Sequence, residues 1–224
     1  NTGLLPEVFG IAEFNATKDT ISKMAFIIVN QTNKNIFDIN NSRHSNDIDK
    51  YFRNYSRKER DKVKFITLDL YKPYYKLMHS LFRNATLISD RFHIVLQSRN
   101  ALDNTRVKLC NKSNSNYSKI KKYWKLILKD RNELDYSKWK KYTCFSNLMT
   151  EIDVVDYILD QDFELKITYY KYQELLEAIK KKNYENFMYA INNVNILTSD
   201  YMKTSIKTLA DFKDKIYNTF NNNY

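Results

Sequence analysis

The stretch that decides the fold is residues 64–95, which read KFITLDLYKPYYKLMHSLFRNATLISDRFHIV. A strand-forming run ends at Asp69, a helix follows, and a second run ends at Asp90, with His93 three residues later. Pro73 stands in the first turn of that helix, where its missing N–H costs nothing. Because open α/β sheets carry their chemistry at the carboxyl ends of the strands, the stretch predicts two β–α units with a site where the strands end.

The residues on either side extend this pattern. Apolar runs predict strands, and the polar stretch at residues 33–35 predicts a hairpin turn. The expected elements, in order, are strands at 7–14, 24–30 and 35–39, a helix at 47–55, a strand at 65–70, a helix, a strand at 86–89 and a helix from residue 91.

This order of elements has one economical solution. Three antiparallel strands form a meander, and parallel strands extend it through right-handed crossovers. We therefore expect an α/β (α+β) ribonuclease-H-like core with a mixed sheet. In such a sheet the first and fourth strands lie side by side, so that residues at matching heights on them can share a metal ion.

The pattern changes near residue 104. From residue 117 to residue 220 no strand is predicted, and apolar residues recur at helical spacing. Residues 150–153 resemble a capping box, residues 198–200 cap a last helix, and that helix is expected at 201–219. We therefore expect an incomplete catalytic core at residues 1–104 and an all-helical lobe at residues 105–224.

Composition limits the classes of protein and partner. The chain has 224 residues and a formal net charge of +11, which favours a polyanionic partner, nucleic acid first and an anionic membrane surface second. The alternative is a basic surface that serves solubility alone. Two cysteines without metal-type spacing argue against a zinc site or a disulfide framework. With no apolar run of membrane-spanning length and no signal-peptide pattern, we expect a cytoplasmic protein.

Asp69 is the first candidate for the site. An acid that directly follows a buried strand needs a cation or hydrogen-bond donors to offset its desolvation. A Mg²⁺ or Mn²⁺ ion held by carboxylates meets that need and can serve phosphoryl chemistry. The alternative is that Asp69 caps the helix that begins near Tyr71.

Asp90 and His93 are the second candidate. Residues three apart share one face of a helix, so this carboxylate and imidazole can meet and position water, phosphate or a ligand. The alternative is that Asp90 caps the helix while His93 packs against the sheet.

A basic stretch follows, since residues 104–129 contain no acid at all. Lysine and arginine neutralise phosphates, and the aromatic residues between them can stack on unpaired bases. The alternative is a solvated helix face whose aromatic residues belong to the core. The candidates for DNA contact are Arg106, Lys108, Lys112, Lys119, Lys121, Lys122 and Lys125.

The motifs PEVFGIAEF, DKVKFITLDLYKPY and NATLISDRFHIV together resemble the bacterial insertion-sequence transposases of the ISL-three kind, within the DDE class. The resemblance implies a ribonuclease-H-like core interrupted by a helical insertion, and Mg²⁺-dependent DNA cleavage and strand transfer at transposon ends. In such enzymes three acids hold two metal ions. The resemblance makes Asp69 the second acid, and makes Asp90 and His93 a D-x-x-H block that supports the site or the DNA. DNA is the implied partner, with an oligomer assembled on it near the nucleoid.

Two departures from the family pattern affect the expected activity. The first acid of the family corresponds to Ala12, while the alternation of a strand turns Glu13 to the other face. The third acid belongs to a segment expected beyond Tyr224, and the family's DNA-recognition parts would precede Asn1. We therefore expect the chain as given to be inactive. The alternatives are an active nuclease that uses Asp69, Asp90 and Glu13, a DNA-binding remnant, or a non-enzymatic helical interaction protein.

Overall fold

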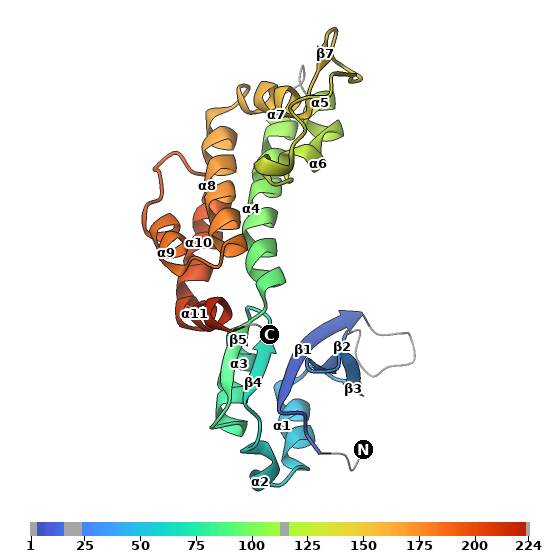
Figure 1. Ribbon diagram of the computed structural model, residues 1–224, viewed down its shortest axis with the longest axis vertical. Coiled ribbons are helices and arrows are strands. Elements are labelled where there is room, and N and C mark those ends of the chain that lie inside the picture. Colours follow the sequence, from blue (N-terminus) through green and yellow to red (C-terminus); the bar gives the residue numbers. More distant parts are fainter. Residues whose placement is uncertain (1–3, 16–23, 113–116, 223–224) are drawn as a thin grey trace. The chain divides into compact units, whose positions relative to one another are not determined.

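The computed structural model describes residues 4–15, 24–112 and 117–222, which divide into two units (Figure 1). Asn1–His93 and Phe212–Tyr224 form the first unit, and Ile94–Asp211 forms the second. The boundary expected near residue 104 lies inside a continuous helix, α4 (Arg91–Lys112). The change of unit therefore comes one helical turn into α4, and the last residues of the chain group with the first unit.

The first unit contains a mixed five-stranded sheet. Strands β1 (Val8–Asn15), β2 (Met24–Asn30) and β3 (Asn35–Asn40) are antiparallel neighbours, while β4 (Phe65–Leu68) and β5 (Thr86–Ser89) run parallel to β1. The strand order is β3-β2-β1-β4-β5, so the first and fourth strands pair side by side as predicted. The expected turn is also present, with Lys34 at a φ of 60° and the Asn33 side chain accepting a hydrogen bond from the Asn35 N–H at 3.0 Å.

Helices cover the sheet and bury an aromatic core. They are α1 (Ser45–Arg53), α2 (Arg57–Arg60), α3 (Lys72–Leu81) and α11 (Lys213–Asn221). Phe9 of β1 stacks on Phe52 of α1 at 5.8 Å between ring centroids, and Phe82 meets Phe52 at 5.0 Å. All three rings are buried, so α1 and the end of α3 are held to the sheet mainly by apolar contact. The single-turn helix α2, which was not predicted, is capped by Ser56, whose side chain accepts from the Glu59 N–H.

The last helix protects the edge of the sheet. Strand β5 lies at the edge, and side chains of α11 donate to its outward carbonyls. The Asn218 amide donates to the Leu87 oxygen at 2.8 Å, and the Thr219 hydroxyl donates to the Ser89 oxygen at 2.7 Å. An exposed strand edge is a template for pairing with other chains, so these two contacts close it.

The second unit is built mostly from helices. Beyond α4 they are α5 (Tyr117–Lys122), α6 (Trp124–Ile127), the 3₁₀ turn η1 (Arg131–Glu133), α7 (Glu151–Leu159), α8 (Phe163–Lys180), α9 (Tyr184–Asn192) and α10 (Asp200–Asp211). The expectation of an all-helical lobe was wrong in one place. Two short strands, β6 (Lys140–Lys141) and β7 (Leu148–Met149), pair as a hairpin. Strands of two residues have no room for an alternating pattern, which explains why they were missed.

Two helix ends in this part of the chain test the predicted caps. Thr150 and Asp153 form the expected capping box, with the Thr150 hydroxyl accepting from the Asp153 N–H and the Asp153 carboxylate accepting from the Thr150 N–H. Ser199 caps α10 by accepting from the Met202 N–H at 3.3 Å. The helix expected at 201–219 is instead two helices, because the backbone leaves helical geometry at Phe212, with φ −107° and ψ 10°.

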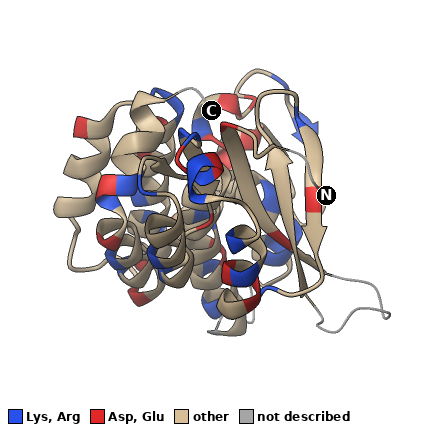
Figure 2. Ribbon diagram, turned by 90° about the horizontal axis from the view of Figure 1, so that it is seen from below, with Lys and Arg blue, Asp and Glu red and all other residues tan. Residues whose placement is uncertain are grey.

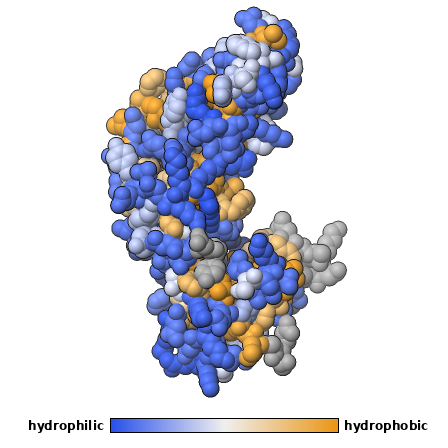
Figure 3. All heavy atoms as spheres, in the orientation of Figure 1, coloured by the Kyte–Doolittle hydropathy of each residue, from blue (hydrophilic) through white to orange (hydrophobic). Residues whose placement is uncertain are grey.

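The surface carries mixed charge. Figure 2 shows Lys and Arg interspersed with Asp and Glu along the helices, so the net charge of +11 is not concentrated in one helix. On the face in Figure 3, hydrophilic residues cover most of the surface and hydrophobic residues form smaller patches. Within the described residues, no helix combines the length and the apolar character that crossing a membrane requires.

Candidate active site

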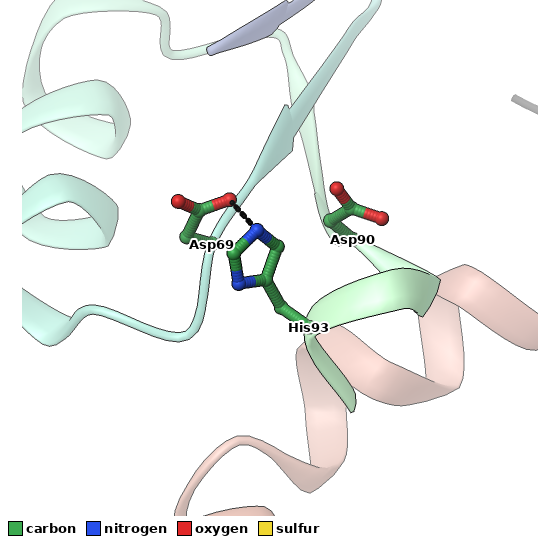
Figure 4. A group of neighbouring side chains, drawn as sticks. All are labelled: Asp69, Asp90 and His93. Carbon is green, nitrogen blue, oxygen red and sulfur yellow. Dashed lines mark ion pairs between the residues drawn. The ribbon is translucent and has the colours of Figure 1, made fainter. Parts of the chain in front are cut away.

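The ends of two adjacent parallel strands bring the predicted site residues together. Asp69 directly follows β4 and Asp90 directly follows β5, and the Asp90 N–H donates to the Leu68 oxygen at 2.8 Å. Helix α4 begins at Arg91, which places His93 in its first turn. As a result, one ligand atom each from Asp69, Asp90 and His93 lies within 4.8 Å of the other two (Figure 4).

The Asp69 carboxylate is close to an imidazole but poorly satisfied. Its Oδ1 atom lies 3.0 Å from His93 Nε2, as the dashed line in Figure 4 marks, and the Asp69 side chain is only 22% exposed. Oδ1 is nevertheless buried without a directed hydrogen bond from any described residue. The carboxylate and the imidazole are therefore close together but not aligned for a hydrogen bond. An unsatisfied buried acceptor costs free energy, and a charged one costs more.

The two aspartates differ in whether they cap a helix. The N-cap of α3 is Tyr71, which has no side-chain cap, and the Tyr71 N–H donates to the backbone oxygen of Asp69 rather than to its carboxylate. The capping alternative therefore does not account for the Asp69 side chain. Asp90 does cap, since its Oδ1 accepts from the Phe92 N–H at 2.9 Å. For Asp90, capping and membership of the cluster hold at the same time.

The electrostatics of the cluster favour a cation. Burial raises the pKa of Asp69 above its ordinary value, the His93 ring opposes that shift, and repulsion from Asp90 and Glu13 adds to it. Repulsion from the two neighbouring acids thus disfavours the ionised form of Asp69, as like charges at one site do. A bound cation would remove both the repulsion and the unsatisfied acceptor.

A cavity of about 490 Å³ lies beside Asp69. It is lined by Glu13, Arg43, His44, Ser45, Asp69, Tyr71 and Tyr74. Glu13 is held within it by Arg43, whose Nη1 lies 2.9 Å from Glu13 Oε2, and by the Tyr74 hydroxyl, which donates to Oε1. Burial and that contact with Glu13 raise the pKa of Tyr74.

The strand register locates the position of the first acid in the family pattern. Gly10 of β1 is level with Thr67 of β4, which is the last pair of that register. Continuing the register by two residues would set Ala12 level with Asp69. Glu13 therefore belongs to the opposite face of β1, as the alternation predicted. It still shares a cavity with Asp69, because β4 ends at Leu68 and the cavity lies beyond that end. The Oγ1 atom of Thr67 is a second buried oxygen without a hydrogen bond from the described residues.

Tyr75 braces the strand ends beneath the cluster and was not predicted. Its buried hydroxyl lies 2.9 Å from Ser89 Oγ and donates to the Leu68 oxygen at 3.3 Å. Burial raises the pKa of this hydroxyl, and repulsion from Asp69 and Asp90 adds to the shift. The available signal was the run of two tyrosines after Pro73, which nothing in the sequence related to the ends of β4 and β5.

Several of the cations predicted to contact DNA have partners inside the second unit. Arg106 is buried, with its Nη2 2.7 Å from Asp103 Oδ1, and the Lys108 ammonium lies 2.9 Å from the Glu164 carboxylate on α8. These two side chains brace α4 within the unit. Their contact with DNA stays a prediction.

The remaining candidates lie on or near α5 and α6. The Lys119 ammonium donates to the Tyr157 hydroxyl at 2.8 Å. Lys121 and Lys125 lie over aromatic rings, those of Tyr117 at 5.3 Å and Trp124 at 5.7 Å from the ring centroid. Lys122 is exposed, and Lys112 ends α4 with its side chain outside the described part of the chain.

Comparison with known proteins identifies a family. A family model described as transposase, of the DDE class and the ISL-three kind, matches residues 9–224. A protein of Lactococcus lactis subsp. lactis described as an ATP-dependent protease is 32% identical over 76 residues, which are 34% of this chain and 24% of that protein. The match thus spans about a quarter of that relative's length. No solved structure matches the chain.

Proposed function

This chain belongs to the DDE transposases of the ISL-three kind, and we propose that it is the catalytic domain of an insertion-sequence transposase with its active site at Asp69. The observation that carries the proposal is the cluster of Asp69, Asp90 and His93 at the carboxyl ends of two adjacent parallel strands. Transposases of this family act on DNA at transposon ends and generally use divalent metal ions. The proposed setting is the bacterial cytoplasm, on the nucleoid, with the protein acting as an oligomer on DNA.

The order and directions of the strands support a ribonuclease-H-like core. Three antiparallel strands are continued by two parallel ones, and Asp69 follows the strand that pairs with β1. We take the second unit, Ile94–Asp211, as the helical insertion. The predicted division at residue 104 is then moved to His93, and the core regains α11 after the insertion.

The residues present fit one divalent cation. The buried Oδ1 of Asp69 lacks a directed donor, and a second carboxylate and an imidazole lie within reach of it. Carboxylate oxygens suit Mg²⁺ and Mn²⁺ alike, while an imidazole favours Mn²⁺. When bound, such an ion would activate water or a DNA 3′-hydroxyl and stabilise the leaving oxygen. Asp69 would hold it, Asp90 would supply the second carboxylate, and His93 would orient the pair.

Ala12 argues against cleavage by the chain as given. Continued by two residues beyond Gly10 and Thr67, the register of β1 and β4 would set Ala12 level with Asp69, where the family's first carboxylate would face the same site. Two-metal catalysis needs ligands for both ions. We therefore propose that the chain as given binds DNA and a single cation without cutting the DNA. The nearby Glu13 cannot easily replace the missing acid, because Arg43 and Tyr74 already engage its carboxylate.

The test is nicking of supercoiled plasmid in Mn²⁺ or Mg²⁺ by four versions of the chain. All four are made in a protein that also carries the family's third acid. There wild type should be inactive, Ala12→Asp should nick, and Ala12→Asn should stay inactive because it matches the size without the charge. Adding Asp69→Asn to Ala12→Asp should abolish nicking. If Ala12→Asp is as inactive as wild type while folded, the assignment of the site is wrong.

The same experiment separates a second candidate, an active nuclease with its own ligand set. The observation that favours it is the cluster of Asp69, Asp90 and His93, which exists without any acid at position 12. Under this reading wild type nicks DNA in Mn²⁺ and Asp69→Asn does not. Inactive wild type under all metal conditions removes it.

A further inference from the structure

We propose that the β6–β7 hairpin is a second nucleic-acid contact, at which an unpaired base of DNA stacks on Trp139. The hairpin comprises residues 136–149 and projects at one end of the second unit, near α5 and α7 (Figure 1). The choice of DNA rather than RNA rests on the proposed function. The stacking site itself rests on the exposed aromatic residues and the lysines of the hairpin.

The hairpin exposes large aromatic side chains beside lysines. Trp139 is 65% exposed and Tyr136 is 78% exposed. Lys138, Lys140 and Lys141 flank Trp139, and residues 136–150 contain no acid. A tryptophan is normally among the most deeply buried side chains on average, so exposure on a projecting element indicates a partner.

The base of the hairpin is fixed, which makes it suited to present that surface. The Glu151 N–H donates to the Asp135 oxygen, and the Asp135 N–H donates to Glu151 Oε2, both at 3.0 Å. The Asp135 carboxylate also accepts from the backbone N–H groups of Ser137 and Lys138, which lowers the pKa of Asp135 to about 2. A preorganised element loses little conformational entropy when it binds.

Tyr123, between α5 and α6, contacts the tip of the hairpin, residues 142–145. The Tyr123 hydroxyl donates to the Thr143 oxygen at 2.6 Å, and its ring lies 5.5 Å from that of Tyr142 and 5.8 Å from that of Phe145. Cys144, at the turn, has a φ of 75°. These contacts hold the tip against α5–α6 while leaving Trp139 at the surface.

Trp139 borders a cavity of about 570 Å³ with aromatic walls and a cation. Phe145 and Tyr157 line it, and the Lys119 ammonium lies 5.3 Å from the Phe145 ring centroid and 4.5 Å from that of Tyr157. The acids on its wall, Asp153 and Asp156, are engaged by Thr150 and Arg131.

Aromatic faces with nearby ammonium groups are the recognition chemistry of unpaired nucleotides, where bases stack and lysines neutralise phosphates. An anionic lipid surface would also attract the lysines. The cavity wall, however, includes Ser146, Asn147 and two carboxylates, which would be costly to insert among acyl chains. The hairpin therefore fits DNA better than it fits a membrane.

The test measures binding of the full chain to a fluorescent oligothymidylate and to a duplex of equal length. Binding is measured by fluorescence anisotropy at low salt. Trp139→Ala should weaken single-strand binding by about fivefold to a hundredfold, since stacking on one aromatic residue is worth about 1–3 kcal/mol per base. Duplex binding should change less than about twofold, and Trp139→Phe should restore most of the single-strand affinity. In a Trp124→Phe background, the oligonucleotide should quench the fluorescence of Trp139.

Several outcomes overturn the proposal. Equal loss of single-strand and duplex binding by Trp139→Ala would mean that the residue supports the structure of the hairpin and does not stack on a base. Unchanged single-strand binding together with loss of binding to phosphatidylserine vesicles would assign the hairpin to a lipid surface. The hairpin is tested by DNA binding without added metal and the active site by metal-dependent nicking, so failure of the hairpin proposal and failure of the proposed active site are distinguishable.

Discussion

Replacing Asp69 by asparagine should stabilise the protein at neutral pH, although the residue lies at the centre of the candidate site. The Asp69 side chain is 22% exposed, and its Oδ1 is buried without a directed donor. A buried acceptor without a partner costs about 1–3 kcal/mol. Removing the charge should therefore recover about 1–2 kcal/mol, which for a chain of this size raises the melting temperature by roughly 2–8 °C.

The pH dependence of that gain has a definite sign. The pKa of Asp69 is raised in the folded state, mainly by burial, so its ionisation destabilises the fold. The penalty is complete above the folded pKa and disappears as the pH falls below the ordinary value of 3.8. The difference in stability between Asp69→Asn and wild type should accordingly be largest at neutral pH and shrink toward zero in acid.

Scanning calorimetry of the full chain across this pH range is the assay. Asp214→Asn, at an exposed acid in the first turn of α11, is the matched control and should change stability by less than about 0.5 kcal/mol. Added Mn²⁺ should stabilise wild type alone, by about 1.4 kcal/mol for a dissociation constant of about 1 mM and about 10 mM ion. A lower melting temperature of Asp69→Asn at neutral pH would instead make Asp69 a residue that stabilises the fold.

Substitutions at Phe52, Lys171 and Thr150 test the contacts that stabilise each unit separately. Phe52→Ala removes the centre of the aromatic core and should cost about 3–5 kcal/mol in urea unfolding, whereas Ile36→Ala, at a side chain 60% exposed, should cost little. The buried Lys171 donates to the last carbonyls of α9, so Lys171→Met should cost about 1–3 kcal/mol and speed amide exchange in that helix; unchanged exchange would contradict this role. Thr150→Ala should lose about 1 kcal/mol by removing the capping box, while Thr150→Ser should retain it, and equal stabilities by thermal melting would count against the cap.

Most of the sheet was predictable because β1, β2, β4 and β5 are apolar runs with buried residues, whereas the more exposed β3 gave a weaker signal. Such runs bounded by turn residues predict strands, and the order of the runs leaves few ways to connect them. The acids after β4 and β5 were visible for the same reason, since parallel strands end at one edge. Their proximity to His93 follows from the helix that starts directly after Asp90.

The contacts made across the fold were not predictable. Lys108 pairs with Glu164, which lies 56 residues away, so the acid-free stretch gave no sign that its cations are engaged. Glu13 is held by Arg43 and Tyr74, and neither is near it in sequence. The β6–β7 hairpin depends on Tyr123 and on the Asp135–Glu151 clamp rather than on its own strand propensity.

The central claim is that Asp69 anchors a divalent cation and that Ala12 marks the missing ligand for a second one. The most direct measurement is the stoichiometry of Mn²⁺ binding, determined from the electron paramagnetic resonance signal of the free ion. Wild type should bind one ion, Ala12→Asp should bind two, and Asp69→Asn should bind none at the site. Two ions bound by wild type, or Mn²⁺ binding that survives Asp69→Asn, would contradict the account.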